Sequence, residues 1–403
     1  MVPNGWNFEN FQTLKISTVD GDRGKNYPKK TDYHSEGYSL FLGADNVADG
    51  KLNLDKCIFL TKEKHESMGK GIAIEDDILL VMRGNGTGRS CIYRGEIKSF
   101  QARINSGLVI IRHNKEFTNI EFLHQLFLSA LIQKQFEGYM FGSAQPQLTI
   151  QLLKSLRFCI PKLEEQEKIA QILSTWDQAI LTTEKLLENS QQQKKALMQQ
   201  LLTGKKRLLD ENGVRFVGEW EKVHIKDCAE CLDNKRVPLN SEQRSLMSGS
   251  IPYWGANGIV DYISDFIFDE TIVLLAEDGG YFDEYQTRPI SNISYGKCWV
   301  NNHAHILRAK KNSLNEWIYY CLVHKNILAF VNGGTRAKLN KSDMLMIPLL
   351  LPSLQEQKKI VSLLSLADQE IETLQKKLDC LKQEKKALMQ QLLTGKKRVK
   401  VAA

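Results

Sequence analysis

The sequence predicts a mixed α/β protein with two globular domains, the first followed by one long helix and the second by another. The chain has 403 residues, and at roughly 100–200 residues per domain that length exceeds one ordinary domain. Hydrophobic residues make up 42% and charged residues 25%, a balance typical of globular proteins. The decisive observation is a segment of 47 residues that occurs twice.

The repeat divides the chain into two halves built on one plan. Residues 161–207 and 352–398 match at 29 of 47 positions, at a constant offset of 191 and without a gap, and both end in KKALMQQLLTGKKR. Upstream, Trp6 and Trp220 differ by 214 positions, so the first globular part is about 23 residues longer. A period near 200 residues indicates a duplicated domain, because solenoid repeats are far shorter. We therefore place domains at 1–160 and 208–351, and helical segments at 161–207 and 352–403.

Each repeated segment is predicted to form one helix of about 40 residues, roughly 60 Å long. Pro161 and Pro352 stand just before the helices, and Gly204 and Gly395 end them. The apolar seam, in steps of three and four, comprises Leu173, Trp176, Ile180, Leu187, Leu197 and Leu201 in the first copy, and Leu364, Ala367, Ile371, Leu374, Leu378, Leu381, Leu388 and Leu392 in the second. Such a seam predicts a coiled coil. A heptad stripe taken alone is most often only an oligomerisation or packing surface. With the repeat, an antiparallel pair of the two copies would relate the globular domains by a pseudo-twofold axis.

Polar residues interrupt this seam. Thr183, Ser190 and Lys194 break it in the first copy, and Lys385 breaks it in the second. The lysines Lys194, Lys195, Lys385 and Lys386 could face an anionic partner or stay in solvent. We expect them to be solvated.

The globular domains share a predicted order of strands followed by a helix. In the first domain, strands are expected at 76–82, 90–93 and 107–112, and a helix at 119–136 with Asn119 as N-cap. In the second, strands are expected at 271–277, 297–300 and 305–308, and a helix at 313–330. Recognition residues are then expected on the polar loops after the strands.

The net charge of +7 is unevenly distributed. The first domain is +3, the two helical segments are +2 and +4, and the second domain is −3, with Lys400 adding the remainder. This mild basic excess permits a nucleic-acid partner without requiring one. The chain shows no signal region at its N-terminus and no apolar run long enough for a bilayer, so we expect a cytoplasmic protein. Its eight cysteines are then expected to be mostly buried thiols.

Motifs for catalysis or metal binding are not evident in the sequence. The loop RGNGTGRS at 83–90 lacks the spacing of a phosphate-binding loop. It is interpreted as a turn after a strand, with a backbone that approaches DNA as the alternative. Cys228 and Cys231 form a CxxC pair without a second pair or a nearby histidine. His303 and His305 alternate along a strand and are interpreted as one surface and one core residue. We therefore predict no catalytic residue and no metal site.

The duplicated ending KKALMQQLLTGKKR resembles the conserved-region signature of type I restriction-modification specificity subunits. Further motifs agree with this resemblance over essentially the whole chain, namely PNGW at 3–6, GSAQPQLT at 142–149, IPKLEEQEKIA at 160–170, IPYWGANGIVDY at 251–262 and WVNNHAHILR at 299–308. The resemblance implies two target-recognition domains, each reading one half of a bipartite, asymmetric DNA site, with the helices packed as an antiparallel coiled coil that sets the spacing.

The resemblance also implies partners and cofactors. Two modification subunits would dock on the helical regions and methylate adenine with S-adenosylmethionine, and restriction subunits would add ATP- and Mg-dependent translocation and cleavage. The chain itself would bind none of these cofactors and would not be an enzyme. Because one domain is net acidic, we expect tight DNA binding only together with the modification subunits. Two alternatives remain open, a coiled-coil scaffold without a DNA role and a methyltransferase or nuclease with unrecognised motifs.

We expect the base contacts among polar residues on the predicted loops, since Arg, Asn, Gln and hydroxyl side chains read base edges. They are Arg83, Asn85, Thr87, Arg89 and Gln101 in the first domain, and Tyr253, Asn257, Tyr281, Tyr285, Gln286 and Arg288 in the second. Base contacts are not carried over to this chain residue by residue from other members of the family, because the recognition domains vary in sequence.

Overall fold

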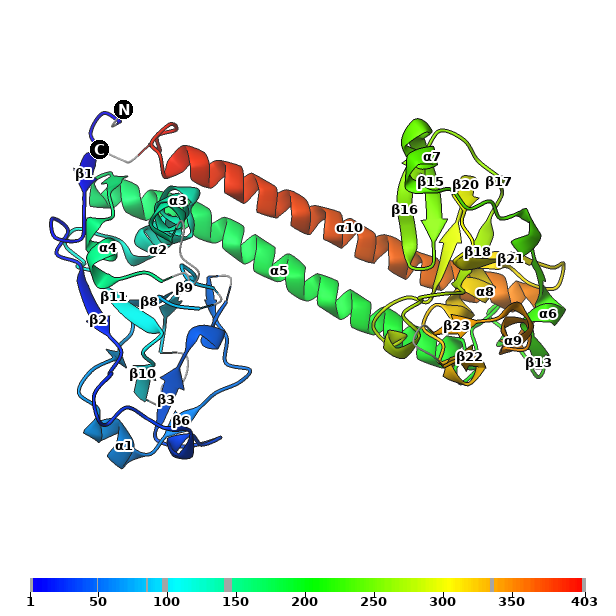
Figure 1. Cartoon of the computed structure of the whole chain (residues 1–403), viewed down its shortest axis with the longest axis horizontal. Coiled ribbons are helices and arrows are strands. Elements are labelled where there is room, and N and C mark those ends of the chain that lie inside the picture. The colour runs from blue at the N-terminus through cyan, green and yellow to red at the C-terminus, as the bar shows by residue number, and fades with distance from the viewer. Residues whose placement is uncertain are drawn as a thin grey trace. The chain divides into compact units, whose positions relative to one another are not determined.

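The computed structural model describes residues 3–48, 50–84, 86–95, 101–140, 147–333 and 337–400. It comprises two compact units (Figure 1). Unit 1 contains Met1–Glu184 and Lys376–Ala403, and unit 2 contains Lys185–Gln375. The long helices α5 (Leu163–Leu201) and α10 (Leu354–Leu392) each contribute one part to each unit. The predicted mixed α/β class with two long helices is confirmed.

Unit 1 is built on two four-stranded sheets. The first is antiparallel, in the order β2 (Ser17–Asp20), β11 (Leu108–Arg112), β8 (Asp77–Val81) and β9 (Ser90–Tyr93). The second has the order β6 (Phe59–Leu60), β3 (Ser39–Leu42), β10 (Gln101–Ile104) and β7 (Ile72–Ala73), and its central strands β3 and β10 are parallel. Two short pairs complete the unit, β1 (Asn7–Glu9) with β12 (Phe158–Ile160) and β4 (Val47–Ala48) with β5 (Lys51–Leu52).

Unit 2 repeats this order of strands. Its antiparallel sheet runs β14 (Ala229–Cys231), β21 (Ala304–Ala309), β18 (Ile272–Ala276) and β19 (Ser291–Ser294). Its second sheet runs β16 (Gly258–Ile263), β15 (Ser248–Gly255), β20 (Lys297–Val300) and β17 (Phe268–Asp269), and β15 and β20 are again parallel. The short pairs are β13 (Glu221–His224) with β24 (Pro348–Leu351) and β22 (Val331–Asn332) with β23 (Lys338–Leu339).

Short helices connect and cover these strands. Unit 1 contains α1 (Lys62–Ser67), α2 (Ile120–Leu128), α3 (Ala130–Met140), α4 (Ile150–Ser155), η1 (Lys30–Asp32) and η2 (Ala44–Asn46). Unit 2 contains α6 (Ile225–Cys228), α7 (Ser241–Leu246), α8 (Asn315–Leu322), α9 (Lys341–Leu345), η3 (Asp233–Lys235), η4 (Phe282–Glu284) and η5 (Leu328–Phe330). Within the described residues, no helix is both long and apolar enough to cross a membrane.

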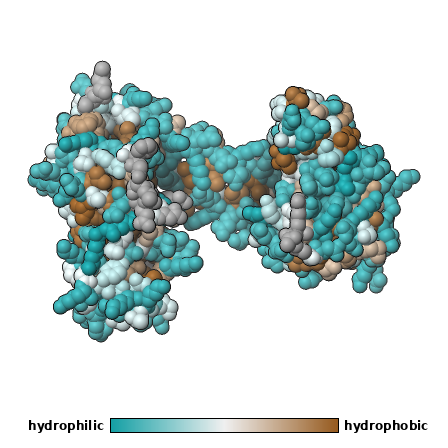
Figure 2. Space-filling model, viewed as in Figure 1, coloured by the Kyte–Doolittle hydropathy of each residue, from teal (hydrophilic) through white to brown (hydrophobic). Residues whose placement is uncertain are grey.

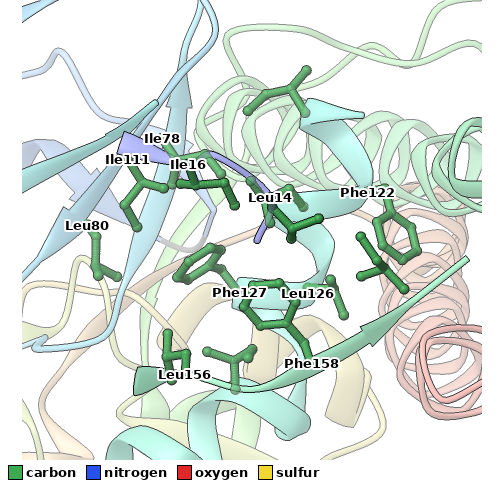
Figure 3. Close-up of a cluster of buried hydrophobic side chains, with 14 of the residues drawn as sticks. Leu14, Ile16, Ile78, Leu80, Ile111, Phe122, Leu126, Phe127, Leu156 and Phe158 are labelled. Carbon is green, nitrogen blue, oxygen red and sulfur yellow. The ribbon is translucent and has the colours of Figure 1, made fainter. Parts of the chain in front are cut away.

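Strand β8, an inner strand of the antiparallel sheet of unit 1, is buried on both faces. Ile78 and Leu80 of β8 pack with Phe122 and Leu126 of α2 in one cluster (Figure 3). Leu79 and Val81 point the other way, because successive side chains of a strand alternate, and join a second cluster that includes β3 and β10. The continuous apolar run of β8 thus reflects a strand covered on both sides.

One predicted helix is divided, and another ends earlier than expected. The helix predicted at 119–136 is divided at Ser129, whose side chain donates a hydrogen bond to the carbonyl of Leu126 at 2.6 Å. A hydroxyl that bonds the backbone in this way competes with the helical pattern. The helix predicted at 313–330 ends at Leu322, since residues 323–327 turn away and the carbonyl of Val323 accepts a hydrogen bond from Ile290. Apolar residues of this segment therefore lie in a core without being helical.

In each unit, the segments of α5 and α10 lie side by side and run in opposite directions (Figure 1). In unit 1, Glu165 pairs with Arg398 and Asp177 with Lys385, so positions rise along α5 and fall along α10. In unit 2, Lys194 pairs with Asp368, and Arg207, just beyond the end of α5, pairs with Glu356. All residues predicted for the apolar seam are buried or half-buried.

Candidate nucleic-acid interface

The parallel strands of unit 2 end at a cavity of about 490 Å³. Its walls come from three loops, the 255–258 turn between β15 and β16, residues 278–279 after β18, and residues 301–303 after β20. Residues 238–239 and Arg244 close one side. Loops at the ends of strands present side chains from a rigid base, which suits a recognition site.

Hydrogen bonds fix these three loops to one another. The amide of Asn301 donates to the carbonyl of Trp254 at 3.0 Å, and the amide of Glu277 donates to the carbonyl of His303 at 2.9 Å. The side-chain amide of Asn257 donates to the carbonyl of Gly279 at 2.9 Å. These hydrogen bonds therefore hold the three loops in one fixed arrangement around the cavity.

Amide and acidic side chains face this cavity. Asn302 is exposed, and its side chain makes no hydrogen bond to any described residue. Asn257 uses only its Nδ2 within the described structure, which leaves its Oδ1 available. His303 Nδ1 lies 3.5 Å from a carboxylate oxygen of Asp278. Asparagine both donates and accepts, so this wall can form paired hydrogen bonds with a base edge.

The β15–β16 hairpin adds apolar surface beside the amides. Ile259 and Val260 line the cavity and are 43% and 57% exposed, and nearby Leu246 of α7 is 82% exposed. Figure 2 shows hydrophobic patches in this region of unit 2, on a surface that is otherwise mainly hydrophilic. Apolar side chains of this kind can contact the methyl group of thymine.

In unit 1, the candidates of the 83–90 loop follow β8. Arg83 is half-buried and forms a backbone bridge to Gln147, and its Nε is buried without a hydrogen-bond partner among the described residues. Thr87 donates its hydroxyl to the carbonyl of Gly84 at 2.7 Å, and Arg89 Nε lies 3.4 Å from the carbonyl of Gly86. Asn85 lies outside the described residues. The loop is a turn after a strand that presents Arg83 at its start.

The other predicted base contacts do not gather at one place. Gln101 begins β10, at the opposite end of that strand from residues 105–107. Tyr253 is 1% exposed, and its hydroxyl accepts a hydrogen bond from the amide of Leu239 at 2.9 Å, which gives it a structural role in the cavity wall. The remaining four lie at 281–288, where Arg288 stacks on Tyr281 with 4.2 Å from Cζ to the ring centroid, and Gln286 donates to the hydroxyl of Tyr285 at 3.2 Å.

The interpretation of Lys194 and Lys385 as solvated residues is wrong. Lys385 is 12% exposed and its Nζ lies 2.7 Å from Asp177, and Lys194 is 17% exposed and pairs with Asp368. Each ammonium group can lie between the packed helices because the carboxylate on the opposite helix compensates its charge. Lys195 and Lys386 are exposed, as expected.

A second pair of repeated contacts ties each globular domain to a helix. Arg207 donates to both carboxylate oxygens of Glu356, at 2.6 and 2.8 Å, and lies over the ring of Trp220. Arg398 makes the same two bonds to Glu165, at 2.6 and 2.7 Å, and lies over Trp6. The identical KKR endings and the glutamates at the same offset of 191 contain the sequence signal for this contact.

Other titratable clusters of unit 2 have structural roles. His305 is 1% exposed, with Nδ1 2.7 Å from Asp233 and Nε2 2.9 Å from the carbonyl of Leu339. Burial would raise the pKa of Asp233, but its hydrogen bond and charge interaction with His305 hold that pKa below its ordinary value. Arg236 pairs with Asp233 and Glu277, so these groups form an ion-pair network. Burial raises the pKa of Cys228 and Cys231 to about 11.

Comparison with known proteins decides the family. The model for the type I restriction modification DNA specificity domain matches residues 7–190 and again residues 218–383. This chain belongs to the type I restriction-modification specificity family. The two matches correspond to the two copies of the domain described above.

Relatives and solved structures agree with this assignment. A putative type I restriction enzyme specificity subunit of Haemophilus influenzae is 36% identical over 147 residues, about a third of each chain. A putative specificity subunit of Methanocaldococcus jannaschii is 27% identical over 99% of this chain and 95% of its own. The crystal structure of the S subunit from M. genitalium matches with a TM-score of 0.63 at 16% identity, covering 98% of this chain and 99% of that one. At that identity, the structural match shows the shared fold.

Proposed function

We propose that this specificity chain reads a bipartite, asymmetric DNA site, with one half-site recognised by each unit. The observation that carries this proposal is the duplicated domain with the same strand order and different loop side chains. Two copies of one scaffold suit two similar half-sites, and different side chains suit different sequences. The apolar and amide side chains around the cavity of unit 2 are of the kinds that read base edges, and so is Arg83 of unit 1.

We further propose that the chain itself is not catalytic. Modification subunits would dock on the helical regions, and restriction subunits would join that complex. S-adenosylmethionine, ATP and Mg would then be used by those partners. This chain would hold the DNA duplex in a fixed position relative to the modification subunits. The methyltransferase would flip the target adenine out of the base stack before methylating it.

The repeated helices support this division of labour. Each helix contributes to both units, so one continuous element connects the two recognition domains. Their sequences end identically over fourteen residues. Two similar surfaces would suit two copies of one partner.

Methylome mapping of the host, with and without this gene, tests the proposal. Loss of one bipartite methyladenine motif upon deletion is the expected result, and restoration by a plasmid copy is the control. An unchanged methylome in cells that express the system would contradict a recognition role. Binding of S-adenosylmethionine by the purified chain would instead favour the alternative of a methyltransferase.

A further inference from the structure

The loops around the cavity of unit 2 have counterparts in unit 1 that are held by the same backbone contacts. The register of the parallel strands pairs Leu42 with Ile104 in unit 1 and Trp254 with Val300 in unit 2. The following residues are Gly-Ala in both units, at 43–44 and 255–256. The strand register thus aligns residues 42–44 of unit 1 with residues 254–256 of unit 2.

Hydrogen bonds confirm that the two loop sets are equivalent. The amide of Asn105 donates to Leu42 at 2.8 Å, as that of Asn301 donates to Trp254 at 3.0 Å. The side-chain oxygen of Asn105 accepts from the amide two residues later at 2.8 Å, and Asn301 does the same. A Cβ on Gly43 or Gly255 would lie 2.7 or 3.3 Å from the Nδ2 of the corresponding asparagine, so both positions require a close approach.

The third loop follows the central strand of the antiparallel sheet. The amide of Met82 donates to Gly107 at 2.8 Å in unit 1, and the amide of Glu277 donates to His303 at 2.9 Å in unit 2. One residue later, Arg83 forms a backbone bridge to Gln147, and Asp278 forms one to Lys338. The same three loops therefore meet in each unit.

The side chains on this common backbone differ at six positions, and at three of these both units carry a polar side chain. Asp45 corresponds to Asn257, Arg83 to Asp278, and Ser106 to Asn302. Asp45 is exposed, and neither its carboxylate nor the amide of Asn302 bonds a described residue. Arginine only donates, ionised aspartate only accepts, and asparagine does both. The two loop sets therefore offer different hydrogen-bonding patterns.

We propose that these three pairs of positions are the specificity-determining positions of the two domains, and that each set contacts base edges of its own half-site. This inference rests on the proposed function. A conserved backbone supplies the geometry of approach, while variable side chains at its tips select the bases. Guanine offers two acceptors to an arginine, and adenine offers a donor and an acceptor to an asparagine. The differences between the sets thus fit an asymmetric site.

The test uses the full chain in complex with its modification subunits and fragments that vary each base pair of the mapped site. Asn302→Ala is the informative variant in unit 2, because its side chain bonds no described residue and its loss leaves the loop contacts in place. Arg83→Gln is the variant in unit 1. We expect each to lower discrimination at one or two base pairs of one half-site, on the order of ten- to a hundred-fold, and to leave the other half-site unchanged.

Matched controls separate recognition from folding. Asn312→Ala removes an exposed asparagine of unit 2, and Arg157→Gln removes an exposed arginine of unit 1, both away from these loops. These variants should keep full discrimination. Unchanged discrimination in Asn302→Ala and Arg83→Gln, or equal weakening at every base pair, would overturn the inference. A wild-type complex that methylates no bipartite site would instead contradict the proposed function itself.

Discussion

Lys385 Nζ lies 2.7 Å from Asp177 Oδ1 in unit 1, and Lys194 and Asp368 form the equivalent pair in unit 2. Each carboxylate also accepts a hydrogen bond from its globular domain. Asp177 accepts from Gln125 of α2 at 2.8 Å, and Asp368 accepts from the hydroxyl of Tyr320 of α8 at 2.8 Å. The pairs therefore join both long helices to a recognition domain at one point in each unit.

This arrangement predicts an asymmetric effect of removing either partner. Asp177→Asn should destabilise unit 1 by about 2 kcal/mol, because it leaves a largely buried ammonium unpaired. Lys385→Met should cost less, since an apolar chain of similar length fills the same space and Asp177 is 45% exposed. The double variant should be more stable than Asp177→Asn alone. Denaturant unfolding of the four proteins measures this, and a double variant that loses the sum of both effects would contradict the pairing.

The arginine contacts predict local effects that differ between units. Arg398 bonds both oxygens of Glu165 and also the carbonyl of Asn4, so it fixes the N-terminal segment beside the end of α10. Arg398→Lys loses the bidentate hydrogen bonding to Glu165 and should destabilise unit 1 by about 1–2 kcal/mol. Hydrogen exchange should then accelerate in β1 and β12. Arg207→Lys is the matched control, for which the acceleration should appear in β13 and β24, and a uniform change in both units would count against this account.

Burial of His124 predicts a pH dependence of unit 1. His124 is 5% exposed, and desolvation lowers its pKa from 6.5 to about 4, while its ring nitrogen Nε2 lies 3.3 Å from the carbonyl of Ser90. The unfolded chain therefore binds a proton that the folded unit resists, so stability falls as the pH drops from about 6.5 toward 4. Between pH 7 and pH 5 this group should cost about 2 kcal/mol.

The variant His124→Gln isolates that effect. Glutamine keeps a donor for the carbonyl of Ser90 but does not titrate, so the loss of unfolding free energy between pH 7 and pH 5 should shrink by about 2 kcal/mol. Urea unfolding at both pH values measures it. An identical pH dependence in the variant and the parent would show that His124 is not the responsible group.

The paired helices predict how the DNA spacer responds to length. Glu184 of α5 pairs with Lys382 of α10 in unit 1, and Ser190 of α5 donates a hydrogen bond to Glu370 of α10 in unit 2. Seven residues inserted between Glu184 and Ser190, together with seven between Glu370 and Lys382, would keep the contacts within each unit. A heptad adds roughly 10 Å of helix, or about three base pairs at 3.4 Å. The methylated motif should gain about three spacer base pairs with both halves unchanged. An insertion in α5 alone is the control and should impair assembly, whereas an unchanged spacer in the doubly lengthened protein would contradict the role of the helices.

The duplication, the long helices and the apolar seam were predictable because repetition and heptad spacing are local properties of the sequence. The ion pairs were not, since Lys194 and Lys385 looked like solvent-facing interruptions until their partners, 174 and 208 positions away, were in place. The break at Ser129 was missed because one hydroxyl bond to the backbone outweighed an apolar helical pattern.

The candidate interface was predictable only in part. Loops after strands were the right class of position, and Asn257 and Arg83 lie on two of the three equivalent loops. Asn302 and Asp45 were missed, because their correspondence depends on strand register and on hydrogen bonds between distant segments. The offset of 191 that aligns the helices does not align these loops, so the repeat alone could not reveal them.

Domain exchange tests the central claim most directly. Residues 208–351 would be replaced by the corresponding recognition domain of another specificity subunit whose methylated motif is known, and the methylome of the host would be mapped. The account predicts that one half of the bipartite motif changes to that of the donor, while the other half is retained. A motif in which both halves change together, or neither changes, would contradict the assignment of one half-site to each unit.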